Sequence, residues 1–96
     1  MKVKDLRNGM KSVSIEAKVT EKSDPREVHS RFKDQTYMVA DVVIADETGS
    51  IKLTLWNEQI DQVSVNDVVK VDNGYVTSFR GEIQLNVGKY GKLVVE

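Results

Sequence analysis

Three aromatic residues in the second half of the chain, Trp56, Tyr75 and Phe79, stand among polar neighbours. Aromatic side chains are usually buried, because each can remove about 150 to 250 Å² of surface from water. Exposed rings can instead stack on nucleic-acid bases, which contributes about 1 to 3 kcal/mol per base and tolerates any base sequence. Lys52 and Arg80 lie nearby in the sequence and could contact phosphates. These residues predict a stacking platform beside cations, unless the aromatics only cover a barrel edge or pack under a loop.

Strands are expected to position these residues, because the dominant hydrophobic period is two. Asp46-Glu47-Thr48-Gly49 reads as a turn between two strands. Asn73-Gly74 interrupts a later strand, and a glycine inside a strand often marks a bulge. The expected strands cover residues 13–20, 37–45, 50–56, 67–79 and 82–88, with a helical turn within 58–65.

The third expected strand alternates strictly and so predicts the direction of the tryptophan. Its apolar residues share one face, and Lys52, Thr54 and Trp56 share the other. Trp56 is therefore out of phase with the core. The inward set of the second strand is expected to be Met38, Ala40, Val42 and Ile44. The other residues predicted to be buried are Val13, Ile15, Val19, Leu53, Leu55, Val69, Leu85 and Val87.

The fourth and fifth strands are expected to form a hairpin whose two-residue loop is Arg80-Gly81. In this register Phe79 faces Glu82 and Tyr75 faces Asn86. Both aromatics then lie on the outer face among polar partners. A register error of one residue would bury both rings.

The pattern predicts an all-β fold. Five strands, a long loop between the first two, and no helical period longer than about two turns favour a small, partly open five-stranded barrel. An SH3-like barrel is the alternative, although its strands tend to be shorter than the run at 67–79.

The segment 23–35 holds the only proline and little periodicity, so it is expected to be a loop. Arg31, Phe32 and Lys33 place an aromatic side chain between hydrogen-bond donors. Because arginine can bind phosphate or stack on a base, the loop reads either as a clamp over a ligand or as a solvated surface loop.

Composition narrows the functional classes. A chain of 96 residues fits one domain, and the absence of cysteine excludes disulfides, thiolate zinc sites and thiol catalysis. No nucleophile stands beside a base and no phosphate-loop motif is present, so we expect no enzyme, no cofactor and no metal. The chain has no signal segment or apolar run, which predicts a soluble, cytoplasmic protein without membrane contact.

Charge alone does not identify a partner. The net charge is −1, yet residues 1–33 carry nine Lys and Arg against five Asp and Glu. Residues 34–72 carry two against eight, and residues 73–96 carry three against two. Basic charge is therefore concentrated in the first third and near residue 80.

Two segments carry a resemblance to a known family. They are DETGSIKLTLW at 46–56 and DNGYVTSFRGEIQLNVG at 72–88. The pair resembles the OB domain of archaeal single-stranded DNA-binding proteins and of replication protein A, and the likeness covers nearly the whole chain. It implies a five-stranded Greek-key OB barrel in which Trp56, Tyr75 and Phe79 stack on bases. Tyr75 departs from the pattern because some members have tryptophan there.

The resemblance implies sequence-tolerant binding of single-stranded DNA in replication, recombination or repair. The Gly-rich or acidic tail of some members is not found, so we expect residues 1–96 to be one OB domain, either whole or excised from a longer multi-OB chain. The alternatives are a protein-interaction module within a replication or repair assembly, which the acidic middle third favours, and an RNA-binding OB domain.

Overall fold

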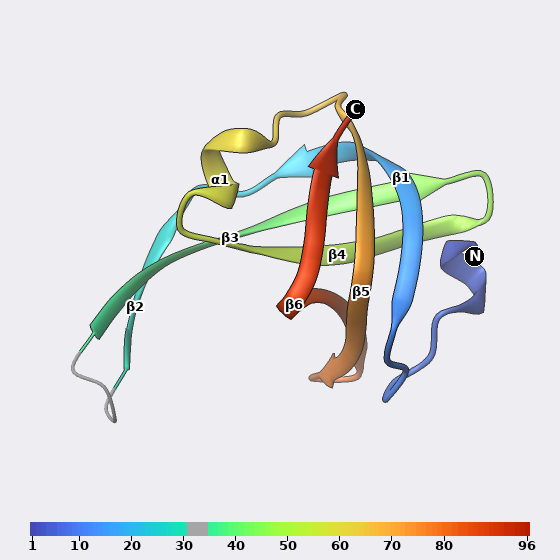
Figure 1. Ribbon diagram of the computed structural model, residues 1–96, viewed down its shortest axis with the longest axis horizontal. Coiled ribbons are helices and arrows are strands. Elements are labelled where there is room, and N and C mark those ends of the chain that lie inside the picture. Colours follow the sequence, from blue (N-terminus) through green and yellow to red (C-terminus); the bar gives the residue numbers. More distant parts are fainter. Residues whose placement is uncertain (31–34) are drawn as a thin grey trace.

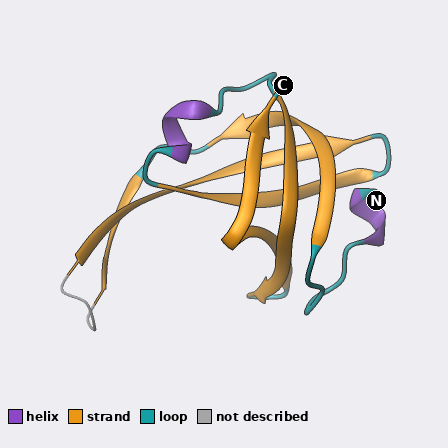
Figure 2. Cartoon of the chain, viewed as in Figure 1, coloured by secondary structure: helices purple, strands orange, loops and turns teal. Residues whose placement is uncertain are grey.

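Six strands form one sheet that curls round on itself (Figures 1 and 2). The computed structural model describes residues 1–30 and 35–96, without the side chains of Ser30 and residues 88–90. Alternating apolar residues build the strands, and two short helical segments connect or precede them. The elements are η1 (Val3–Asp5), β1 (Val13–Lys22), β2 (Arg26–Ser30), β3 (Gln35–Asp46), β4 (Gly49–Trp56), α1 (Gln59–Gln62), β5 (Val68–Phe79) and β6 (Glu82–Val95).

Strand pairings close five of the strands into a ring. The order across the sheet is β1-β5-β6-β4-β3-β2, and β1 pairs in addition with β3. All pairs are antiparallel except β4 with β6, which run parallel with Leu53 opposite Leu85. The five strands expected to form a partly open barrel are therefore present and pair into a ring, with β2 as a sixth strand outside it.

The interior of the ring is packed with the apolar residues that the alternation predicts. Leu53 is fully buried, so β4 has the predicted phase. Val87 is only partly buried and packs against the margin of the core. Apart from Met38, the other predicted core residues are all buried, namely Val13, Ile15, Val19, Ala40, Val42, Ile44, Leu55, Val69 and Leu85.

Part of the expected loop at 23–35 is a strand. Residues Arg26–Ser30 form β2, which pairs with the beginning of β3 in a ribbon that extends away from the ring (Figure 1). Met38 lies on this ribbon and is 40% exposed, so its predicted inward position is wrong. Beyond the ring neither face of the ribbon meets a core, and alternation there no longer separates inside from outside.

The β5–β6 hairpin has the predicted register. Phe79 pairs with Glu82 and Tyr75 with Asn86, and Arg80 and Gly81 both have positive φ, as a type I′ turn requires. The predicted bulge is also present, because the register shifts between Asp72 and Gly74. An added Cβ at Gly74 would lie 2.9 Å from the Asn86 carbonyl oxygen, so glycine allows the two strands to approach here.

The turn between β3 and β4 holds the N-terminal segment against the ring. The Asp46 carboxylate accepts hydrogen bonds from the Thr48 hydroxyl, from the Val3 N–H at 2.9 Å and from the Thr48 N–H. These bonds lower the pKa of Asp46 from 3.8 to about 2, because each stabilises the charged form. The Lys4 N–H donates to the Thr48 hydroxyl at 3.1 Å, which leaves Val3 and Leu6 packed in the core.

Candidate nucleic-acid interface

The registers bring the predicted site residues of β4 and β5 onto one outer face. Residues paired across neighbouring strands share a face. One row of pairs runs from Thr54 on β4 through Asn86 on β6 to Tyr75 on β5. A parallel row joins Lys52 through Gln84 to Thr77. We call this surface, which includes Trp56 and Phe79 at the ends of the two strands, the platform.

The three predicted aromatic residues are exposed on the platform. Trp56 and Tyr75 are each 40% exposed, and Phe79 is 58% exposed. Thr54 and Tyr75 are separated by two strand spacings, a distance of roughly 10 Å. Trp56 lies two residues beyond Thr54 along β4. The rings therefore lie on a common surface rather than on separate sides of the molecule.

Two residues of the outer face are buried although they point away from the core. Thr54 is 7% exposed and Val39 is 3% exposed, and Val39 pairs with Trp56. Neighbouring side chains must shield them from water, so these two residues lie lower on the outer face than the exposed rings. The prediction that Thr54 shares a face with Trp56 is correct, but Thr54 is buried there and forms part of the floor of the platform between the exposed rings.

A fourth aromatic residue, Tyr37, contacts the tryptophan. The Tyr37 ring stands edge-on to Trp56 with centroids 6.0 Å apart and an interplanar angle of 84°. The Tyr37 hydroxyl donates a hydrogen bond to Gln35 Oε1 at 2.7 Å. The backbone N–H of Trp56 donates a hydrogen bond to Gln59 Oε1 at 3.2 Å, which connects the end of β4 to α1. Sequence reasoning missed Tyr37 as a site residue, because the contact depends on the β3–β4 register.

Cations of the platform are already engaged within the protein. Lys52 Nζ lies 3.5 Å from the Glu82 carboxylate, and the Arg80 guanidinium lies 5.2 Å from the centroid of the Phe79 ring. Arg26 on β2 contacts the Asp41 carboxylate at 3.1 Å. A phosphate that approaches Lys52 must therefore compete with a carboxylate.

The β2–β3 ribbon continues the outer face beyond the ring. Arg26 pairs with Val39 and Val28 pairs with Tyr37, so Arg26 and Val28 share the face of the aromatic pair. Val28 is 38% exposed. The predicted clamp residues Arg31, Phe32 and Lys33 lie outside the described residues.

Comparison with known proteins assigns a family to this arrangement. The model of the family described as single-stranded DNA binding protein Ssb-like, OB fold, matches residues 6–95. The chain belongs to this family. Membership confirms the predicted OB fold, and the Ssb-like proteins are binding proteins rather than enzymes, as the sequence predicts.

Several archaeal relatives are similar to this Ssb-like chain. It is 35% identical to the single-stranded DNA binding protein Ssb of Saccharolobus solfataricus over 96% of its own length and 61% of that protein. It is 29% identical to replication factor A of Methanothermobacter thermautotrophicus over 85% of its length and 10% of that protein. The Ssb-like chain thus spans about three fifths and one tenth of these two relatives.

Solved structures show the same fold. The OB domain of Ta0387 from Thermoplasma acidophilum matches with a TM-score of 0.84 and 27% identity, covering 100% of this chain and 85% of that one. The second OB-fold domain of replication protein A from Methanococcus maripaludis matches with a TM-score of 0.80 and 26% identity, covering 99% and 92%.

Membrane-spanning helices and metal-binding clusters are both absent from the described residues of the Ssb-like chain. No helix among them is long and apolar enough to cross a bilayer. Within the same residues, no cluster of three or more His, Asp or Glu side chains is placed to hold a metal ion.

Proposed function

We propose that this chain binds single-stranded DNA with little sequence preference, by stacking bases on Trp56, Tyr75 and Phe79. The observation that carries the proposal is the presence of three exposed aromatic rings on one continuous outer face of a closed sheet. Burial of the same rings would have stabilised the fold, and base stacking of about 1 to 3 kcal/mol each offsets that loss when DNA binds.

The floor between the rings suits a nucleic-acid strand. Thr54, Gln84 and Asn86 are polar, and Asn86 Nδ2 donates a hydrogen bond to the Thr77 hydroxyl at 3.0 Å. Such groups can hydrogen-bond the edges of bases whose faces lie on the rings. They are few and sequence-tolerant, which agrees with binding to any base.

Phosphate contacts are proposed for Lys52, Arg80 and Arg31. Phe32 and Lys33, which lie outside the described residues, are also proposed to contact the DNA. For a single strand, each phosphate contact contributes about 0.7 to the slope of log affinity against log salt concentration. Because Lys52 is paired with Glu82, we expect a shallow slope.

Service in replication, recombination or repair is part of the proposal. Its support is the names of the relatives, a single-stranded DNA binding protein and a replication factor. Contacts of the platform with a partner protein are the competing explanation for exposed aromatic residues, because such residues also anchor protein interfaces.

The test is to replace each ring and measure both stability and DNA affinity. Oligo-dT should quench Trp56 fluorescence in the unmodified protein. Trp56→Ala should weaken binding of labelled oligo-dT most, by about 1 to 3 kcal/mol, since a ring on a rigid strand loses less entropy on binding than a mobile one. Tyr75→Ala and Phe79→Ala should follow, and none should unfold the domain.

Val65→Ala is the matched control, because Val65 is exposed but lies outside the platform. It should leave affinity unchanged. If the three ring variants instead melt at much lower temperature while the folded fraction binds oligo-dT normally, the rings are structural and the stacking proposal is wrong. Competition with oligo-U on the same samples measures the preference for DNA over RNA.

A further inference from the structure

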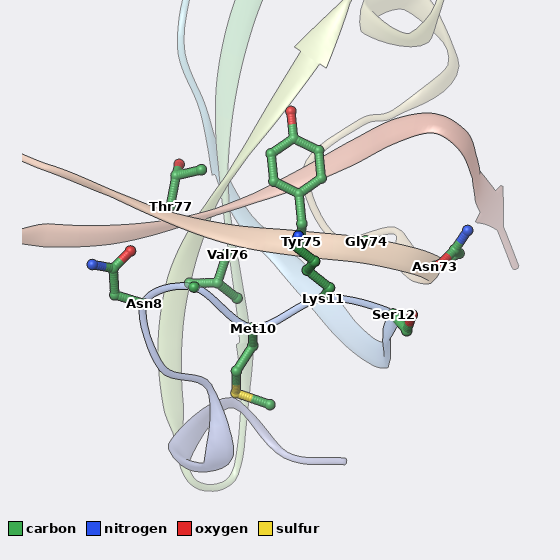
Figure 3. A pocket seen from close by; sticks show the side chains of 10 residues that line it. Asn8, Met10, Lys11, Ser12, Asn73, Gly74, Tyr75, Val76 and Thr77 are labelled. Atoms are coloured by element: carbon green, nitrogen blue, oxygen red, sulfur yellow. The ribbon is translucent and has the colours of Figure 1, made fainter.

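A groove of about 560 Å³ borders the platform where the N-terminal segment crosses the edge of β5 (Figure 3). One wall is residues 8–12 and the other is residues 73–77. Tyr75 belongs both to this groove and to the platform. Figure 3 shows Tyr75 and Thr77 projecting from one side of β5, with Asn8 and Met10 on the other side.

The wall formed by residues 8–12 is fixed to β5 by backbone hydrogen bonds. The Gly9 N–H donates to the Val76 carbonyl at 3.0 Å, and the Val76 N–H donates to the Met10 carbonyl at 2.9 Å. Ser12 and Asn73, at the end of the groove, both have positive φ, of 55° and 57°. Side chains with a Cβ seldom adopt this conformation unless the surroundings impose it. The groove is therefore built into the fold.

The lining has the chemistry of a nucleotide site. Amide groups of Asn8 and Asn73 can donate and accept hydrogen bonds at base edges, and the hydroxyls of Ser12 and Thr77 can do the same. Met10 and Val76 supply apolar surface between them.

Charge in the groove also favours a phosphate. None of the lining residues is acidic, and Lys11 is the cation among them. Within the described part of the chain Lys11 forms no ion pair, whereas Lys52 and Arg26 on the outer face are each paired with a carboxylate. Lys11 can therefore accept a phosphate without first releasing an internal partner.

We infer that this groove is an additional subsite that binds the nucleotide next to the one stacked on Tyr75. This inference rests on the proposed function, because the strand reaches the groove from the platform. The base lies over the hydrogen-bonded walls with its edge toward Asn8 at one end or Asn73 at the other, and its phosphate contacts Lys11. The consequence is a binding site at least one nucleotide longer than the three rings alone provide.

The test measures the affinity of Lys11→Gln for oligo-dT of increasing length, at decreasing salt concentrations. Loss of one phosphate contact should reduce the salt slope by about 0.7, so Lys11→Gln should gain about fivefold less affinity than the unmodified protein for each tenfold fall in salt. The effect should be present with long oligo-dT and absent with oligomers too short to pass Tyr75. Lys18→Gln on β1 is the control, since it removes the same charge from an exposed strand position outside the groove.

A second readout observes the groove directly. The side-chain amide resonances of Asn8 or of Asn73 should shift in NMR spectra when long oligo-dT is added. If Trp56 is quenched but neither amide moves and Lys11→Gln matches Lys18→Gln, the groove inference is wrong and the proposed function stands. If oligo-dT of every length leaves Trp56 fluorescence unchanged, the proposed function itself is refuted.

Discussion

Glu82→Gln should strengthen binding of single-stranded DNA, because Glu82 forms an ion pair with Lys52, the residue proposed to contact a phosphate. The Glu82 carboxylate lies 3.5 Å from Lys52 Nζ on the platform, and both side chains are exposed. Exposed ion pairs of this kind contribute little to the free energy of unfolding. The substitution should therefore leave the fold intact while it frees Lys52 and removes a negative charge from the path of the DNA.

The expected size follows from counting released cations. One additional phosphate contact steepens the salt slope by about 0.7, which is about fivefold in affinity for each tenfold fall in salt. Asp41→Asn should act in the same way through Arg26, whose guanidinium lies 3.1 Å from the Asp41 carboxylate. The two substitutions together should steepen the slope by about 1.4, or about 25-fold per tenfold change in salt.

The assay is Trp56 quenching by oligo-dT over a range of salt concentrations. Asp61→Asn on α1 is the control, because it makes the same change of charge at an exposed position away from the platform. Glu82→Gln and its control should diverge as salt falls. Equal slopes for the two variants would refute the idea that Glu82 withholds Lys52 from phosphate, and would leave only a general effect of net charge.

Three further predictions concern the core, the aromatic pair and the N-terminal segment. Leu53→Ala should lower the free energy of unfolding by about 2 to 5 kcal/mol in urea titrations, because Leu53 is fully buried; a smaller loss would contradict the assigned phase of β4. Tyr37→Ala should weaken oligo-dT binding by removing the ring that braces Trp56, and Tyr37→Phe should retain most of the affinity; equal losses would assign the effect to the hydroxyl. The pKa of Asp46 is lower in the folded state, so its contribution to stability is complete above about pH 4 and disappears as the pH falls toward 2. Asp46→Asn should flatten acid unfolding across that interval, and an unchanged acid profile would show that these hydrogen bonds do not stabilise the fold.

The fold was predictable where local chemistry and burial agree. Arg80-Gly81 can adopt the positive φ values of a tight hairpin, and the register that follows places Tyr75 opposite Asn86 and Phe79 on the outer face. In β4 one side of the strand meets the core along its length, so the alternation around Leu53 gave the direction of Trp56 correctly.

Prediction failed where the sheet leaves the core. Residues 26–29 are all exposed, so no alternation between buried and exposed positions distinguishes this part of β2 from a loop. Met38 was assigned to the core by the two-residue alternation of its strand, which does not follow burial where the strand extends beyond the ring. The contact between Tyr37 and Trp56 requires strand pairings that lie outside the reach of local sequence patterns.

The parallel pairing of β4 with β6 determines when the platform comes into existence. Leu53 meets Leu85 across about thirty intervening residues, and within this sheet β6 follows all the other strands in chain order. Pairings between distant residues slow folding because the entropy of loop closure is lost before the stabilising contacts form. Trp56 and Tyr75 are brought onto one surface only by β6, which lies between their strands. A chain in which β6 has not yet paired therefore carries the aromatic side chains but not the platform, so the proposed DNA-binding surface forms in the same step as the fold.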